Sequence, residues 1–258
     1  MTRTALRPLS GELEVWQSNS LVEASHTMTL NERRLIYAAA ALHDPRRPVP
    51  ASGSVKFHAD EFGDVFGLEL TSKGRYHDLA EAAERLFNRR IESIHNSNGR
   101  VVRHMRWVWL AEYNAGEATV TLGFSPPVLP YLTMLSKEFT RFKLKHIGNI
   151  GSQYGLRLYE ICAQWRVAGR FALTLQELRD RFALADKYSS VKDLQRWVLT
   201  PSLREVNTHT DFRVTMTTER RGRKIIGFKF EIKRDTQIPL DLPMPEEEEE
   251  EERLAGGG

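Results

Sequence analysis

The chain contains an internal repeat, and this repeat restricts the possible folds more than any other feature. Five positions of the first half recur in the second half at a constant separation of 116 residues: Glu61, Phe62, Asp64, Phe66 and Leu68 correspond to Glu177, Leu178, Asp180, Phe182 and Leu184. Asp78 and Leu79 correspond to Asp193 and Leu194 at a separation of 115 residues. Chance similarity between two amphipathic segments would not keep the separation so constant. We therefore expect two copies of one structural unit.

The first copy is predicted to consist of three helices followed by a β-hairpin. Thr29-Leu30-Asn31-Glu32 forms a capping box, which predicts a helix that ends at about Leu42. A short second helix is expected over 60–66, and apolar residues at helical spacing predict a long third helix over 75–91. Strands are then expected at 91–95, 101–113 and 118–124, with a tight turn at Asn98-Gly99.

The second copy repeats this order of elements. A helix is expected over 156–167, and a capping box over 174–177 begins a short helix that ends at about Phe182. A longer helix is predicted from Ser190 to Asn207, and Pro201 should kink or break it. Strands at 212–218 and 225–233 flank a turn at Arg221-Gly222. The pattern predicts an α+β fold of two tandem winged-helix domains related by internal duplication.

The chain divides into four expected parts. Segments rich in proline or glycine at 44–53, 125–130 and 147–155 separate its elements. We expect an N-terminal extension over 1–20, a first winged-helix domain over 21–135, a second over 136–235 and an acidic disordered tail over 236–258.

The charge is distributed unevenly along these parts. The formal net charge of +3 is the sum of two unequal parts. The tail, residues 236–258, has eight acids and one base, and the body, residues 1–235, has 36 bases and 26 acids. A body with ten excess positive charges favours a polyanionic partner. The single cysteine excludes an internal disulfide and a paired-cysteine zinc site, and it is typical of the reducing cytoplasm. No apolar run reaches the length of a membrane span, so we expect no membrane association.

Neither a phosphate-binding loop nor the metal-binding histidine pair of a nicking enzyme is complete in the sequence. The segment Gly222–Gly227 resembles a phosphate-binding loop only in its glycines, because Phe228 stands where lysine is required. The eight histidines do not provide the closely spaced pair that holds the metal of a nicking enzyme. Cys162 lies on an apolar helix stripe, where a buried inert thiol is expected. The sequence thus predicts a protein that is not an enzyme and that uses no cofactor or metal.

Candidate DNA contacts are concentrated in the second domain. In a helix-turn-helix unit the second helix enters the major groove with its first turns against the base edges. Gln195 and Arg196 suit base readout there, and Lys187 and Lys192 suit phosphates. The predicted wing adds four cations around one glycine: Arg220, Arg221, Arg223 and Lys224. The alternative is a solvated polar face without a partner.

The first half offers fewer such residues. Lys73 and Arg75 begin its long helix, and Arg100 and Arg103 lie near its predicted wing. We expect Lys73 and Arg75 to contact phosphates, and the alternative is that this half forms an interface with a partner. The segment Trp107–Leu110 is apolar enough for either the core or a dimer surface.

A further basic cluster precedes the second domain. Arg141, Lys143 and Lys145 lie close together in the sequence, and they are either DNA contacts or part of a charged linker.

Over residues 21–233 the sequence resembles the plasmid replication initiators that bind iterons, the direct repeats of a plasmid origin. The segments that carry the resemblance are 21–24 with 30–35, 139–144, 152–160, Asp193-Leu194 with Val198-Leu199, Pro201, 205–207 and 222–224. No one of these segments is diagnostic, but their joint order is specific.

The resemblance implies a function. Such proteins bind origin repeats as monomers, promote strand opening, and recruit the host initiator ATPase and the replicative helicase. As dimers joined through the first domain they bind an inverted repeat and repress their own gene, so a homodimer in equilibrium with a monomer is expected in a bacterial cytoplasm. The family commonly has basic residues where this chain has Gln195 and Trp197. We expect Gln195 and Arg196 to read bases and Trp197 to lie in the core.

Three other functions stay open on the sequence alone. One is a dedicated winged-helix transcriptional repressor without initiator activity. A second is a nicking enzyme of rolling-circle type, against which the histidine spacing argues. A third is a protein-interaction scaffold, which would show no salt-dependent DNA affinity.

Overall fold

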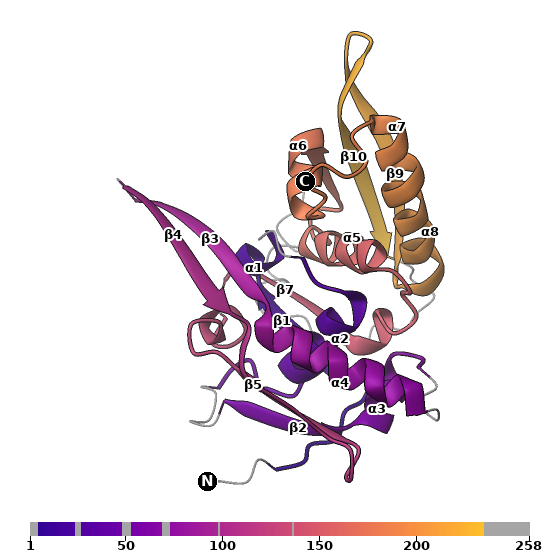
Figure 1. The fold of residues 1–258 in the computed structure, drawn as a ribbon. Helices are drawn as coiled ribbons and strands as arrows, with labels where there is room; N and C mark the ends of the chain where they lie inside the picture. Colours follow the sequence, from indigo (N-terminus) through magenta and orange to yellow (C-terminus); the bar gives the residue numbers. More distant parts are fainter. Residues whose placement is uncertain are drawn as a thin grey trace, which may run out of the picture.

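The computed structural model describes residues 5–23, 27–47, 53–68, 73–97, 99–135 and 137–234, and for 73–75, 92–97 and 99–103 it describes the backbone alone. The acidic tail expected at 236–258 lies outside the described residues. The described chain forms two α+β units (Figure 1), one made mainly of the indigo and magenta segments and the other of the orange and yellow segments. No helix in the described ranges is long and apolar enough to cross a bilayer.

The first unit places three helices against a small antiparallel sheet. Its elements are α2 (Leu30–Ala41), β2 (Ser54–His58), α3 (Ala59–Val65), α4 (Lys73–Asn88), β5 (Val108–Asn114) and β6 (Thr119–Phe124). The sheet has the order β2-β6-β5, so that β6 pairs with both neighbours. The capping box at Thr29 forms as predicted, because the Thr29 hydroxyl accepts from the Glu32 amide and the Glu32 carboxylate accepts from the Thr29 amide.

The second unit has the same arrangement. Its elements are α5 (Gln153–Gln164), β8 (Arg170–Thr174), α6 (Leu175–Arg181), α7 (Val191–Leu194), the π-helical segment η3 (Gln195–Leu199), α8 (Thr200–His209), β9 (Phe212–Arg221) and β10 (Lys224–Arg234). The sheet order is β8-β10-β9, with β10 in the centre. The predicted capping box at Thr174 is present, with Glu177 as its acidic partner.

The duplication predicted from the sequence is confirmed by this topology. β2 and α3 begin at residues 54 and 59, and β8 and α6 begin at residues 170 and 175, which keeps the separation of 116. The two strands β2 and β8 were not predicted, because five alternating residues are too few to be distinguished from a loop. Each of them completes a three-stranded sheet.

The two units differ by an inserted β-ribbon. β3 (Arg90–Ser97) and β4 (Gly99–Arg106) pair with each other as a two-stranded ribbon between α4 and β5. The predicted hairpin at Asn98-Gly99 therefore exists, although residue 98 lies outside the described residues. The wing that corresponds to the β9–β10 turn is instead the turn at 115–118 between β5 and β6. The expectation that Arg100 and Arg103 lie near the wing of the first unit is thus wrong.

The two units are connected by a sheet that the sequence did not indicate. β1 (Glu14–Ser18) pairs antiparallel with β7 (Phe139–Lys143), and the Trp16 and Phe139 rings stack with centroids 4.7 Å apart. Residues 14–18 were expected in an extension, yet their backbone forms a sheet with a strand expected in the second domain. A division of the chain at residue 135 does not separate the two units cleanly, and the residue limits of the domains stay a prediction.

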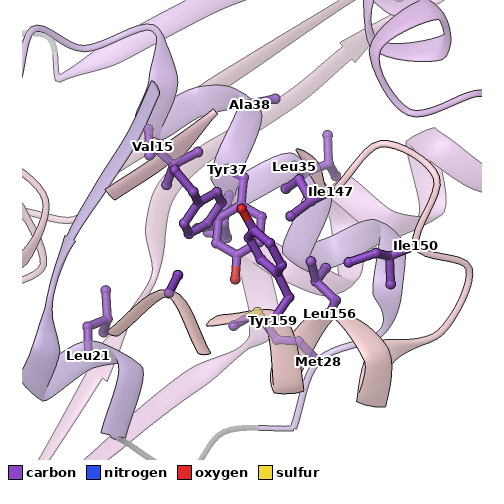
Figure 2. Close-up of a cluster of buried hydrophobic side chains, with 14 of the residues drawn as sticks. Val15, Leu21, Met28, Leu35, Tyr37, Ala38, Ile147, Ile150, Leu156 and Tyr159 are labelled. Carbon is purple, nitrogen blue, oxygen red and sulfur yellow. The ribbon is translucent and has the colours of Figure 1, made fainter. Parts of the chain in front are cut away.

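The core is shared between the units. Figure 2 shows buried side chains of α2 and α5 together, among them Tyr37 and Tyr159. Phe142 of β7 lies edge-on to both tyrosines, with ring centroids 5.3 and 5.4 Å apart. Cys162 is fully buried in α5 as predicted, and burial raises the pKa of its thiol, which leaves it unreactive.

Candidate nucleic-acid interface

The turn between α6 and α7 is held by a single arginine. The Arg179 guanidinium donates to the carbonyl oxygens of Lys187, Tyr188 and Ser189 at 2.9, 2.6 and 2.9 Å. Ser190 then caps α7, because its Oγ accepts from the Asp193 amide at 3.0 Å. These bonds fix the direction in which the next helix begins, and they leave the Lys187 side chain exposed.

The helix that follows runs through Pro201 without interruption, so the predicted break is wrong. Proline lacks an amide hydrogen and its ring collides with the carbonyl of the residue four positions earlier. The chain avoids this conflict through the π-helical segment over Gln195–Leu199, in which the Thr200 amide bonds to the Gln195 carbonyl five residues back. The wider turn admits Pro201 at the start of α8. Short π segments of this kind recur at functional sites.

The π segment determines which side chains face outward. Leu194, Val198 and Leu199 are fully buried, whereas Trp197 is 54% exposed. The expectation that Trp197 belongs to the core is wrong, because the three apolar positions around it already fill the inner face. The Arg196 guanidinium carbon lies 4.8 Å from the centre of the Trp197 ring, a cation–π contact on the outer face. The available signal in the sequence was that Leu194, Val198 and Leu199 already form an apolar helix stripe, which leaves Trp197 beside it.

The remaining predicted residues of this helix also lie on or near its surface. Lys192 and Arg196 are exposed, and Gln195 is half-buried. The structure therefore brings Lys187, Lys192, Gln195 and Arg196 together on the turn and the first turns of one helix. Exposed cations of this kind offer phosphate contacts, and the arginine and the amide offer base contacts.

The wing projects beyond the body of the second unit (Figure 1). Gly222 adopts a φ of +63°, which the tight turn requires and which other residues rarely adopt. The four cations of the wing are all exposed, namely Arg220, Arg221, Arg223 and Lys224. None of the four forms a salt bridge within the described part of the chain, whereas Lys229, further along β10, pairs with Glu219 at 3.3 Å.

The equivalent surface of the first unit is less basic. In α4 the predicted core residues Leu79, Ala82, Ala83 and Leu86 are buried. The outer face carries Glu81, which pairs with Arg85 at 2.9 Å. Lys73 and Arg75 begin α4, but their side chains lie outside the description, so their contact with phosphates stays a prediction. The wing turn carries Glu117, which pairs with Lys56.

The cluster before the second unit differs from the expectation. Arg141 is only 6% exposed, and its guanidinium carbon lies 5.5 Å from the centre of the Trp16 ring. This side chain packs against Trp16, its neighbour on β1, and its burial leaves it unavailable to a ligand. Lys143 and Lys145 both pair with Glu12, at 2.9 and 2.8 Å. The hydrogen bonds from the two lysines lower the pKa of Glu12 to about 2, and the bond from Lys145 has the larger effect.

The segment Trp107–Leu110 is divided between the two alternatives left open by the sequence. Trp107 and Val108 are buried, whereas Trp109 is 51% exposed. The Trp109 ring covers Gly123 on the neighbouring strand, where a Cβ atom would lie 2.7 Å from the indole nitrogen. Trp109 lies on β5, an edge strand of its sheet.

A buried ionic network joins the two units, and sequence reasoning missed it. Glu160 of α5 is 2% exposed and accepts from Arg33 of α2 at 2.6 Å and from Arg157 at 3.1 Å. The Tyr37 hydroxyl also donates to this carboxylate. Burial opposes the charge of Glu160, but the two arginines outweigh it and lower its pKa. The spacing of Arg157 and Glu160, three residues apart on one helix, was the available signal.

The same helix α2 also contacts α4. The Glu32 carboxylate is fully buried and accepts two bonds from Arg89, at 3.0 and 3.2 Å, besides an ion pair with Arg85 at 3.3 Å. Arg34 donates to the carbonyl oxygens of Gly148 and Ile150 at 3.3 and 2.9 Å. Three successive charged residues of α2 therefore hold α4, α5 and the loop before α5.

Two family models match the chain. The model described as "Initiator Replication protein, WH1" matches residues 14–163, and the model described as "Initiator Rep protein, WH2" matches residues 174–232. The first match alone spans more than half of the chain. The chain belongs to the initiator replication protein family. Both the resemblance and the tandem winged-helix fold predicted from the sequence are thereby confirmed.

Individual relatives agree with this assignment. A replication initiation protein of Escherichia coli is 26% identical over 89% of this chain and 72% of its own length. An uncharacterized 27.6 kDa protein of Escherichia coli is 23% identical over 78% of this chain and 88% of its own length. The crystal structure of the Pi initiator protein in complex with iteron DNA superposes with a TM-score of 0.74 at 21% identity, over 88% of this chain and 99% of that one.

Family membership also gives the general activity. The initiators of this family are non-catalytic DNA-binding proteins, so this chain acts in replication initiation by binding DNA. The exposed helix start and wing of the second unit are the surfaces that suit this activity.

Proposed function

We propose that this initiator binds the iterons of a plasmid origin and opens the adjacent duplex through binding and bending of DNA. The observation that carries the proposal is the second unit, in which the cations of one helix start and of one wing are exposed together. The similar fold of the Pi initiator, which was solved with iteron DNA, supports the same ligand.

The proposed contacts follow the usual docking of such a unit. α7 and the π segment enter the major groove, where Arg196 pairs with guanine and Gln195 with adenine. Lys187 and Lys192 contact the flanking phosphates, and the cations of the wing track the neighbouring backbone. Lys73 and Arg75 of the first unit add phosphate contacts that fix the register.

The test is a comparison of cognate and scrambled duplexes at fixed salt. Replacing a base-reading arginine costs about 1–3 kcal/mol of binding free energy and relaxes specificity at one position. We expect this result for Arg196→Ala, whereas Arg223→Ala on the wing should weaken cognate and scrambled binding equally. If Arg196→Ala binds the cognate duplex as tightly as the unchanged chain does, then α7 and the π segment are not the reading helix, the helix that contacts the bases.

The proposal extends to a dimer that represses the gene of the initiator. The exposed Trp109 on the edge strand β5 supports a self-association surface on the first unit. In the monomer the chain would recruit the host initiator ATPase and the replicative helicase. Sedimentation of Trp109→Ser against the unchanged chain tests the surface, because a weaker dimer with intact iteron binding is expected.

A dedicated repressor is the competing function. A plasmid that carries only this gene and its flanking repeats separates the two functions, because an initiator maintains it in a suitable host. Repression of the promoter without replication would favour the repressor.

A further inference from the structure

A cavity lies between the two units, apart from the face assigned to base readout. Its volume is about 160 Å³, enough for several water molecules. It is lined by residues from the start of α2, the end of α4, the start of α5 and the α6–α7 turn, and these include Arg33, Arg89, Arg157, Arg181 and Lys187.

The lining is strongly basic. It contains five cations, and none of the described residues that line it is acidic. Three carboxylates outside the lining pair with four of these cations: Glu160 with Arg33 and Arg157, Glu32 with Arg89, and Glu23 with Arg181 at 3.7 Å. Five cations against three carboxylates leave an excess of two positive charges around the cavity, one of them on the exposed Lys187, and such an excess attracts an anion.

One buried donor of the lining lacks an acceptor. Arg33 is 5% exposed, and its Nε has no hydrogen-bond partner among the described residues, although its terminal nitrogen holds Glu160. A buried donor of this kind is unfavourable when it stays unpaired. The first turn of α5, a helix of 12 residues, adds the positive end of a helix dipole at Gln153 and Tyr154.

We propose that this cavity binds a phosphate group through Arg33, Arg181 and Lys187. Phosphate matches the site because it brings up to two negative charges and several acceptor oxygens to a lining whose polar side chains are cations, hydroxyls and one amide. The occupant is either a free phosphate-bearing molecule or one phosphate of the DNA backbone. Lys187 could contact a phosphate from either source, because it lies on the turn before the reading helix and is exposed at the rim of the cavity.

The occupant would act on both units at once. Arg33 and Arg89 belong to the first unit, whereas Arg181 and Lys187 belong to the second. A phosphate held between them therefore stabilises one relative placement of the two units. The free-phosphate source is independent of the iteron function, and the backbone source rests on it.

Inorganic phosphate is the first probe, titrated into the full chain without DNA at constant ionic strength, with chloride as the reference anion. Phosphate should raise the thermal midpoint, and Arg181→Gln should weaken phosphate binding about tenfold or more, because a charge-assisted bond is lost. Arg181 does not belong to the proposed base or phosphate contacts of the reading helix. Lys187→Gln is the second variant, and Lys233→Gln, an exposed lysine outside the lining, is the matched control.

The salt dependence of iteron binding is the second measurement. If a backbone phosphate occupies the cavity, Arg181→Gln reduces the slope of log K against log salt by about one, and the control does not. Phosphate binding in the first measurement identifies a free ligand, and a changed slope alone identifies the backbone. Both results support the cavity as a phosphate site.

The proposal is overturned if phosphate stabilises Arg181→Gln and Lys187→Gln as much as it stabilises Lys233→Gln, and if Arg181→Gln also keeps the salt slope of Lys233→Gln. If the unchanged chain does not bind iterons, the proposed function is contradicted instead. The phosphate titration would still test whether the cavity binds phosphate.

Discussion

The guanidinium of Arg33 lies 2.6 Å from the carboxylate of Glu160, and this buried pair joins α2 of the first unit to α5 of the second. Because Glu160 also accepts from Arg157, one carboxylate compensates two buried guanidinium groups. The two winged-helix units are consequently fixed to each other by charge as well as by the shared aromatic core.

Glu160→Gln should destabilise the protein strongly. Removing one partner of a buried ion pair leaves uncompensated charge and typically costs about 3–5 kcal/mol. Urea-induced unfolding measures the effect, with Glu231→Gln, an exposed glutamate of β10, as the control with the same change of charge. A loss no larger than that of the control would show that the pair does not hold the units together.

Trp197→Ala should weaken DNA binding without much effect on stability. The ring is 54% exposed, and it supports the Arg196 guanidinium from 4.8 Å. An exposed cation–π contact contributes about 0.5–1 kcal/mol, or about two- to fivefold in Kd. A double-mutant cycle with Arg196→Ala isolates this coupling. Strict additivity of the two substitutions would show that the stacking does not position the arginine.

His43→Leu should reduce the sensitivity of the protein to acid. In the folded protein the pKa of His43 is lowered from 6.5 to about 4. Burial is the larger cause, and the positive charge of Arg7 is the smaller one. As the pH falls below 6.5 the unfolded chain binds this proton and the folded chain does not. The free energy of unfolding therefore declines by about 3 kcal/mol from this group between pH 6.5 and 4.

Leucine removes this contribution and keeps an apolar contact with the neighbouring Phe124 ring, whose centroid is 5.6 Å from that of His43. The free energy of unfolding, measured in urea from pH 7 to pH 4, should fall less steeply in His43→Leu than in the unchanged chain. Parallel curves would mean that His43 titrates normally in the folded protein.

Glu12→Gln tests whether Lys143 and Lys145 contact DNA. Both lysines are held by Glu12 in the free protein. Exposed ion pairs contribute only about 0–1 kcal/mol to stability, so the variant should fold normally. If the lysines face bound DNA, their release should raise affinity at low salt beyond the gain of Glu231→Gln, and equal gains would remove them from the interface.

Much of the fold was predictable because its signals are local. The capping boxes at Thr29 and Thr174 depend on residues three positions apart, and both formed where they were expected. The alternating strands around Gly222 became β9 and β10 for the same reason. The constant separation of 116 residues predicted the duplicated topology without any long-range information.

Three errors arose where side-chain packing or local helix geometry, and not residue spacing, decides the outcome. Arg141 looked like one of a basic cluster, but the ring of Trp16, which lies on another strand, covers it. Pro201 was expected to kink or break its helix, but the π turn before it lets the helix continue without a break. Trp197 was expected inside, but Leu194, Val198 and Leu199 already occupied that face.

The sequence by itself determined the order of the elements, their duplication, the basic wing and the family, because each depends on residue types at fixed spacing. Only the tertiary structure decided which charged residues remain available to a ligand. It pairs β1 with β7, buries Glu160 between Arg33 and Arg157, and leaves Arg196 and the wing exposed. The physical reason is that the exposure and pairing of a charge depend on whatever side chain packs against it, and that side chain can be more than a hundred residues away.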